Sequence, residues 1–172
     1  MHQATADELE VTGLNMTTAL PNFCQPADTV VAIEQFYAQV ATVCTDGRAR
    51  CNDPRSVRQL GYLAREAQRL AQTAQNHRLA HLNASANAFI QYTPERSLPG
   101  EDDLTLLTQQ CTDVPAALRL ILDSTESFIM IHRELQRRAR TAEAADLHRG
   151  CCVLLDTWQK NLSRAYVQDA DI

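Results

Sequence analysis

The sequence predicts an all-α fold in which four main helices pair as two hairpins joined by a longer crossover. Apolar residues recur at every third or fourth position over most of the chain, which is the period of an amphipathic helix. Turn formers are scarce, with 5 glycines and 6 prolines in 172 residues. The alternation of β-branched residues that marks a strand is nearly absent. Apolar residues make up 45% of the chain, enough for one core, so we expect one antiparallel four-helix bundle over residues 27–168.

The first 26 residues show no sustained period, and we expect an irregular or disordered tail there. The first helix is predicted to begin at Ala27 or Asp28 and to end at Cys44, because its apolar residues keep the helical period over that range. The Thr-Asp-Gly sequence that follows should stop it, with Gly47 as a left-handed cap.

The second helix is predicted to begin at Asp53 and Pro54, a good N-cap followed by a good first helical residue. Leu60 and a series of alanines at helical spacing give it an apolar seam. The pattern can continue to Tyr92, which is long for a small domain. A break is therefore expected near residues 83–87, and one uninterrupted helix is the alternative.

Residues 93–101 hold two prolines and a glycine and are predicted to form the loop that carries the chain across the bundle. Asp102 or Asp103 should then cap a short helix that ends near Gln110. Asp113 and Pro115 are expected to begin the second hairpin.

The second hairpin, residues 115–166, carries the clearest helical pattern of the chain. Its two helices each repeat apolar residues at spacings of three and four, so each presents one apolar stripe. Thr141 and Ala142 are predicted to lie in the turn between the helices. Trp158, the one tryptophan, falls on the stripe of the last helix and should be buried. The end from Val167 is expected to fray, with an acidic terminus at residues 169–172.

Charge and hydropathy exclude several classes of partner. A net charge of -5 argues against a general nucleic-acid binder. No apolar run is long enough to span a bilayer, and residues 1–10 lack the features of a secretory signal. We therefore expect a cytoplasmic protein with no nucleic-acid or membrane partner. The six cysteines are then expected to be thiols, and none has the spacing of a zinc or redox motif.

Four stretches resemble a known family. AIEQFYAQVA (Ala32–Ala41) followed by LGYLAREAQRLAQ (Leu60–Gln72) resembles the first hairpin of rubrerythrin-like proteins of the ferritin-like superfamily. LRLILDSTESFIMIHRELQRRA (Leu118–Ala139) and LLDTWQKNLSRAY (Leu154–Tyr166) are similar to its second hairpin. The resemblance covers most of residues 27–166 and implies a ferritin-like bundle.

That family holds two metal ions with carboxylates from all four helices and with Glu-x-x-His motifs on two of them. In this chain the resemblance aligns the inward ligand positions of the first three main helices with Val30, Ala67, Leu70 and Thr125, and the motif of the fourth with residues 156–160, which contain no histidine. A shift of the alignment by one residue would bring in Glu34, Glu66 and Glu126, but no histidine at the required spacing. The resemblance therefore implies the fold of the family without its usual di-iron activity.

Two histidine positions are weaker candidates for chemistry. His77 and His81 lie four residues apart, so both rings share one helix face and could bind a metal ion together, with a polar surface patch as the alternative. His132 lies on the apolar stripe of the third main helix, where a core histidine bonded to a neighbouring side chain is the favoured interpretation.

Cys151 and Cys152 are adjacent on the last helix, and a disulfide between them would strain it. Cys151 falls on the apolar stripe and Cys152 on its flank. We expect both thiols to pack in the core, with a redox or soft-metal role as the alternative.

These observations favour a non-catalytic helical bundle that needs no cofactor and acts through self-association or by binding another protein. The alternative is a metal-dependent, di-iron-type oxidoreductase or iron-handling protein that uses iron or manganese. Its atypical ligands would come from Glu34, Glu66, His77, His81, Glu126 and His132. A thiol-based redox protein that uses Cys151 or Cys152 is the third interpretation.

Overall fold

The computed structural model describes residues 25–81, 90 and 97–170, and within them it is all-helical, with no strand. The helices are α1 (Pro26–Arg50), α2 (Pro54–Ala80), α4 (Glu101–Gln110), α5 (Val114–Arg138) and α6 (Ala142–Ala170). No helix in this part of the chain is both long enough and apolar enough to cross a membrane. Nearly all of the predicted tail, and the predicted break at residues 83–87, lie outside the described residues.

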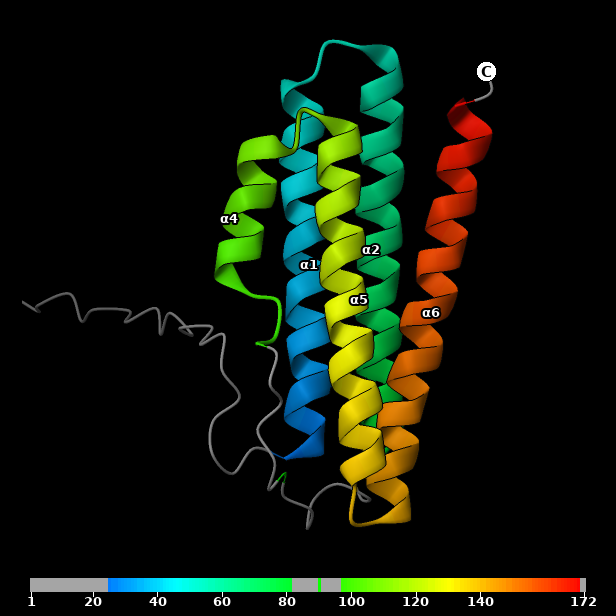
Figure 1. Cartoon of the computed structure of the whole chain (residues 1–172). Helices are drawn as coiled ribbons and strands as arrows, with labels where there is room; N and C mark the ends of the chain where they lie inside the picture. Colours follow the sequence, from blue (N-terminus) through cyan, green and yellow to red (C-terminus); the bar gives the residue numbers. More distant parts are fainter. Residues whose placement is uncertain (1–24, 82–89, 91–96, 171–172) are drawn as a thin grey trace, which may run out of the picture.

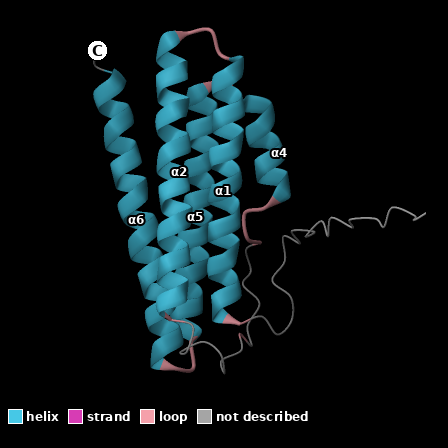
Figure 2. Ribbon diagram, turned by 180° about the vertical axis from the view of Figure 1, so that it is seen from behind, coloured by secondary structure: helices cyan, strands magenta, loops and turns pink. Residues whose placement is uncertain are grey.

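The four long helices lie side by side, and α4 packs outside them against α1 and α5 (Figure 1). The most extensive contacts join α1 to α2 and α5 to α6, which are the two hairpins that the sequence pattern indicates. Further contacts between α2 and α6 and between α1 and α6 bring the hairpins together. The α1–α2 connection and the α5–α6 turn lie at opposite ends of the molecule, and the carboxyl-terminal half of α6 diverges from α2 in both views (Figures 1 and 2).

Aspartate side chains cap the amino-terminal ends of α2 and α5, as predicted. Asp53 accepts a hydrogen bond from the Ser56 main-chain N–H at 2.8 Å, and Asp113 accepts one from Ala116 at 3.1 Å. These bonds satisfy N–H groups that have no partner within the helix. Asp103 lies inside α4 and accepts from the main chain of Gly100, the residue before the helix. The cap of α4 was predicted at Asp102 or Asp103, two or three residues after the observed N-cap at Gly100.

The prediction that α1 ends at Cys44 with Gly47 as a left-handed cap is wrong. The helix continues to Arg50, and Gly47 is a buried residue inside it. A Cβ built on Gly47 would lie 3.0 Å from Cys111 Sγ and 3.3 Å from the Cys111 carbonyl oxygen. Gly47 therefore serves close packing, because only a residue without a side chain lets the end of α4 approach α1 this closely.

Two helix ends also differ from prediction. α2 ends at Ala80, where the His81 main-chain N–H bonds to the Arg78 carbonyl oxygen, so the alternative of one uninterrupted helix to residue 92 is wrong. α6 begins at Ala142, which was expected in the turn, and Thr141 Oγ1 accepts from the Ala144 N–H at 3.1 Å. The same helix extends to Ala170, past the predicted fraying point.

The middle of the core is aromatic. Tyr37 contacts Phe36, Phe128 and Trp158, with ring centroids between 5.1 and 6.1 Å apart. The angles between Tyr37 and two of these rings are 85° and 68°, the edge-to-face arrangement that aromatic pairs prefer. Trp158 is 6% exposed, which confirms its predicted burial, and its indole N–H donates to the Glu66 carbonyl oxygen at 3.2 Å. This cluster joins α1, α2, α5 and α6 at one level.

Candidate functional site

The four positions that the ferritin-like resemblance aligned with metal ligands are all buried. Val30, Ala67 and Thr125 are fully enclosed, and Leu70 is 4% exposed. Thr125 hydrogen-bonds to the Tyr37 hydroxyl at 2.7 Å and donates its own proton to the Ile121 carbonyl oxygen at 2.6 Å. Because the Thr125 proton is used in the second bond, the Tyr37 hydroxyl is the donor of the first bond, and both polar groups are satisfied. Burial raises the pKa of Tyr37 well above its usual value, so the phenol stays protonated.

The three candidate glutamates do not converge. Glu34 on α1 receives two hydrogen bonds from Arg78 on α2, at 2.6 and 3.1 Å, so both of its carboxylate oxygens bind the guanidinium. Glu66 is paired with Arg69 on the same helix at 2.7 Å. Glu126 is exposed on α5. Two of the candidates thus serve ion pairs, Glu34 between α1 and α2 and Glu66 within α2.

The candidate histidines lie at the end of the molecule that holds the α5–α6 turn, where a fourth histidine joins them. His132 on α5 and His148 on α6 are 0% and 1% exposed, and their Nδ1 atoms are 3.1 Å apart. One of these nitrogens must carry the hydrogen and the other must accept it. The prediction of a core histidine bonded to a neighbouring side chain is confirmed for His132. Its other nitrogen, Nε2, is buried with no hydrogen-bond partner.

His77 and His81 on α2 form the second half of this group, with ring centroids 4.5 Å apart. His77 Nε2 lies 3.0 Å from the Leu147 carbonyl oxygen and therefore donates to the main chain of α6. The His77 ring covers Gly150, where an added Cβ would clash with the His77 Cε1 atom. His81 Nδ1 bonds to the His77 carbonyl oxygen at 2.9 Å. We call these four side chains, His77, His81, His132 and His148, the histidine layer.

The His132–His148 pair disfavours positive charge. Burial lowers the pKa of His132 well below 6.5, and the neighbouring His148 and His77 lower it further, against a smaller opposing effect of the Thr29 main chain. Burial alone lowers the pKa of His148 to about 4. Both rings of the pair are therefore neutral at pH 7.

The thiols on α6 are buried as expected. Cys151 is 1% exposed, and burial raises its pKa far above the usual value, with smaller contributions from Cys152 and Glu34. Burial also raises the pKa of Cys152 to about 11, and its thiol lies 3.8 Å from the Ile129 carbonyl oxygen. Neither thiol has the depressed pKa that marks a reactive cysteine.

Sequence reasoning missed His148 and a second thiol group. His148 precedes Cys152 by four residues and Leu155 by seven, so the helical period could have placed it on the buried face. Cys111, at the end of α4, accepts a hydrogen bond from Arg50 Nη2 at 2.6 Å. Burial raises the pKa of the nearby Cys44 to about 12, with an additional effect of Cys111. Contacts between α1 and α4 cannot be read from the spacing within either helix.

Within the residues that the structure describes, no three side chains of the His, Cys, Asp and Glu types are arranged so that they could hold a metal ion. Comparison of the chain with protein-family models, curated protein sequences and solved structures finds no significant match.

Proposed function

We propose that this chain is a non-catalytic four-helix bundle of ferritin-like topology that acts as an interaction module, through self-association or by binding another protein. The supporting observation is the filled centre. Where the resemblance would put metal ligands, Val30, Ala67 and Leu70 are part of the buried core that includes the aromatic cluster, and the Tyr37–Thr125 hydrogen bond satisfies the polar groups of Thr125. A substrate or metal site in the bundle centre needs an open cavity with converging polar groups, whereas a filled centre suits a scaffold.

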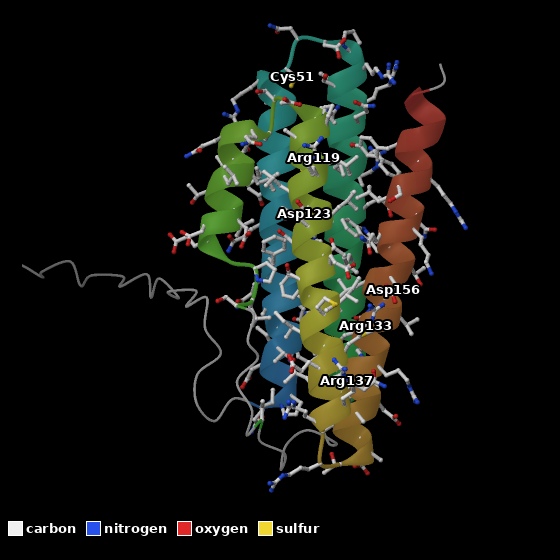
Figure 3. All side chains as sticks on the ribbon, viewed as in Figure 1. Cys51, Arg119, Asp123, Arg133, Arg137 and Asp156 are labelled. Carbon is white, nitrogen blue, oxygen red and sulfur yellow. The ribbon has the colours of Figure 1, made fainter. Side chains whose placement is uncertain are left out.

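The surface gives a second line of support. Ion pairs hold several of its charges, including Arg133 of α5 with Asp156 of α6 at 3.2 Å (Figure 3). Large apolar side chains are nevertheless exposed on the second hairpin, with Met130 of α5 at 38% and Val153 of α6 at 60%. Single exposed apolar residues are common on monomers, but the same residues supply contact area when two surfaces meet. They are the first positions at which to test self-association.

Sedimentation velocity over a range of protein concentrations tests the proposal. We expect reversible self-association that Val153→Glu or Met130→Glu weakens, because a charge in an apolar contact is costly. Glu126→Gln, at an exposed position on α5, is the control and should leave association unchanged. If the chain stays monomeric at every concentration, self-association is excluded and the module must act on another protein. Stoichiometric iron or manganese in protein purified without chelator would contradict a non-catalytic role.

A further inference from the structure

The His132–His148 pair tolerates little positive charge. Its 3.1 Å contact joins two Nδ1 atoms, so it holds one hydrogen when both rings are neutral. A first added proton must enter at the His132 Nε2, which has no partner, or at the free side of His148. If both rings are protonated, each Nδ1 carries a hydrogen, and the two N–H groups face each other and cannot bond. Water must then reach the rings to solvate the charge.

Within the described residues, no carboxylate forms an ion pair with either ring. The ionisable side chains at this end include, from α1, Asp28 and Glu34; from α2, His77, Arg78 and His81; from α5, Arg133, Glu134, Arg137 and Arg138; and from α6, Glu143, Asp146, Arg149, Cys151, Cys152 and Asp156. Four of these carboxylates already bind arginines: Glu34 with Arg78, Glu134 with Arg138, Asp146 with Arg149 and Asp156 with Arg133. His77 opposes protonation of His132, and the Thr29 main chain favours it by less than burial and His148 oppose it. An added proton is therefore only partly compensated in the folded arrangement.

We propose that the His132–His148 pair is an acid-sensitive latch: when neutral it holds the amino-terminal half of α6 against α2 and α5, and when protonated it releases that half. The proposal is independent of what the module binds.

The amino-terminal half of α6 is the part that the histidines hold. It follows a turn of only three residues, 139–141, at the end of the molecule. On the α2 side it is held by the bond from His77 to the Leu147 carbonyl oxygen and by the close contact of the His77 ring with Gly150. Farther along α6, the Trp158 indole N–H donates to the Glu66 carbonyl oxygen of α2, and its ring contacts Tyr37 in the aromatic cluster. These contacts contain no histidine, so acid should loosen α6 only as far as Trp158.

Hydrogen exchange followed by mass spectrometry tests the latch. Exchange is measured at about pH 7 and about pH 4.5, above and below the ordinary histidine pKa of about 6.5, so that rings released from the pair bind protons at the lower pH; the rates are corrected for the intrinsic pH dependence. We expect protection of residues 142–155 to fall about tenfold or more at the lower pH, with little change in residues 54–70 of α2. The double variant His132→Gln/His148→Gln cannot titrate at the pair and should show no such pH response. His81→Gln, which leaves the pair intact, should retain it.

Three outcomes would overturn the proposal. The first is an equal loss of protection in both segments, which means general acid unfolding. The second is a pH response that persists in the double variant. If that variant fails to fold, the comparison of residues 142–155 with residues 54–70 in the unaltered protein decides alone. All samples contain a chelator, and a parallel series omits it. If chelator alone exposes residues 142–155 at neutral pH, the histidines hold a metal ion and the latch is wrong.

Discussion

Trp158→Ala should be among the most destabilising single substitutions in the chain. The indole is 94% buried, touches Tyr37 edge-to-face at a centroid distance of 5.1 Å, and donates to the Glu66 carbonyl oxygen. Truncating a buried tryptophan to alanine costs roughly 3–5 kcal/mol, since it removes apolar contact and leaves a cavity. For a chain of this size such a loss lowers the melting temperature by roughly 6–20 °C. Urea titration monitored by circular dichroism gives the free energy of unfolding directly.

Trp158→Phe separates the contributions. Phenylalanine keeps an aromatic ring against Tyr37 but cannot donate to the Glu66 carbonyl oxygen, so the free energy of unfolding should fall by less than in the alanine variant. Fluorescence of the unaltered protein should show the blue-shifted emission of an enclosed indole. A water-like emission maximum, or a loss below about 1.5 kcal/mol in Trp158→Ala, would refute the placement of this residue at the junction of the helices.

Three further predictions concern Gly150, His148 and the helical content of the protein. Gly150→Ala should destabilise the protein, because the added methyl group meets the His77 ring; His77→Ala should relieve this clash, and equal effects of Gly150→Ala in both backgrounds would exclude the contact. The free energy of unfolding should be at its full value above about pH 6.5 and fall by about 3 kcal/mol toward pH 4, because the unfolded state binds a proton that folded His148, with its pKa near 4, does not; acid and urea titrations of His148→Gln should show a smaller slope. Circular dichroism should show a strongly helical spectrum, and a measurable strand component above a few per cent would contradict the fold.

The sequence predicted the helices well and their ends less well. Asp53 and Asp113 carry the side-chain chemistry of a cap, and both helices begin there because the signal is local. The prediction that Gly47 ends α1 was wrong because glycine, which often caps a helix, also permits close packing inside one. Only the position of Cys111, which lies on another helix, distinguishes the two roles. A one-dimensional pattern does not contain that information.

The candidate site was predictable to the same limited extent. The helical period identified His132 and Cys151 as buried, since the core face of a single amphipathic helix is visible in its sequence. It could not show that Glu34 would bind Arg78, because the two residues lie on different helices. The pairing of His132 with His148 likewise depends on how α5 and α6 align across their turn. Function at such sites depends on contacts between elements, which spacing alone does not determine.

Thermal unfolding with and without metal ions tests the filled centre most directly. The positions aligned with di-iron ligands are Val30, Ala67, Leu70 and Thr125, and all are buried in side-chain contacts. The melting temperature should therefore be the same in chelator and in micromolar iron, manganese or zinc, because an ion that binds the folded state alone would raise it. A rise of several degrees would show that ligands converge in the folded protein and would contradict the account, and His77, His81 and Glu126 would be the first residues to substitute.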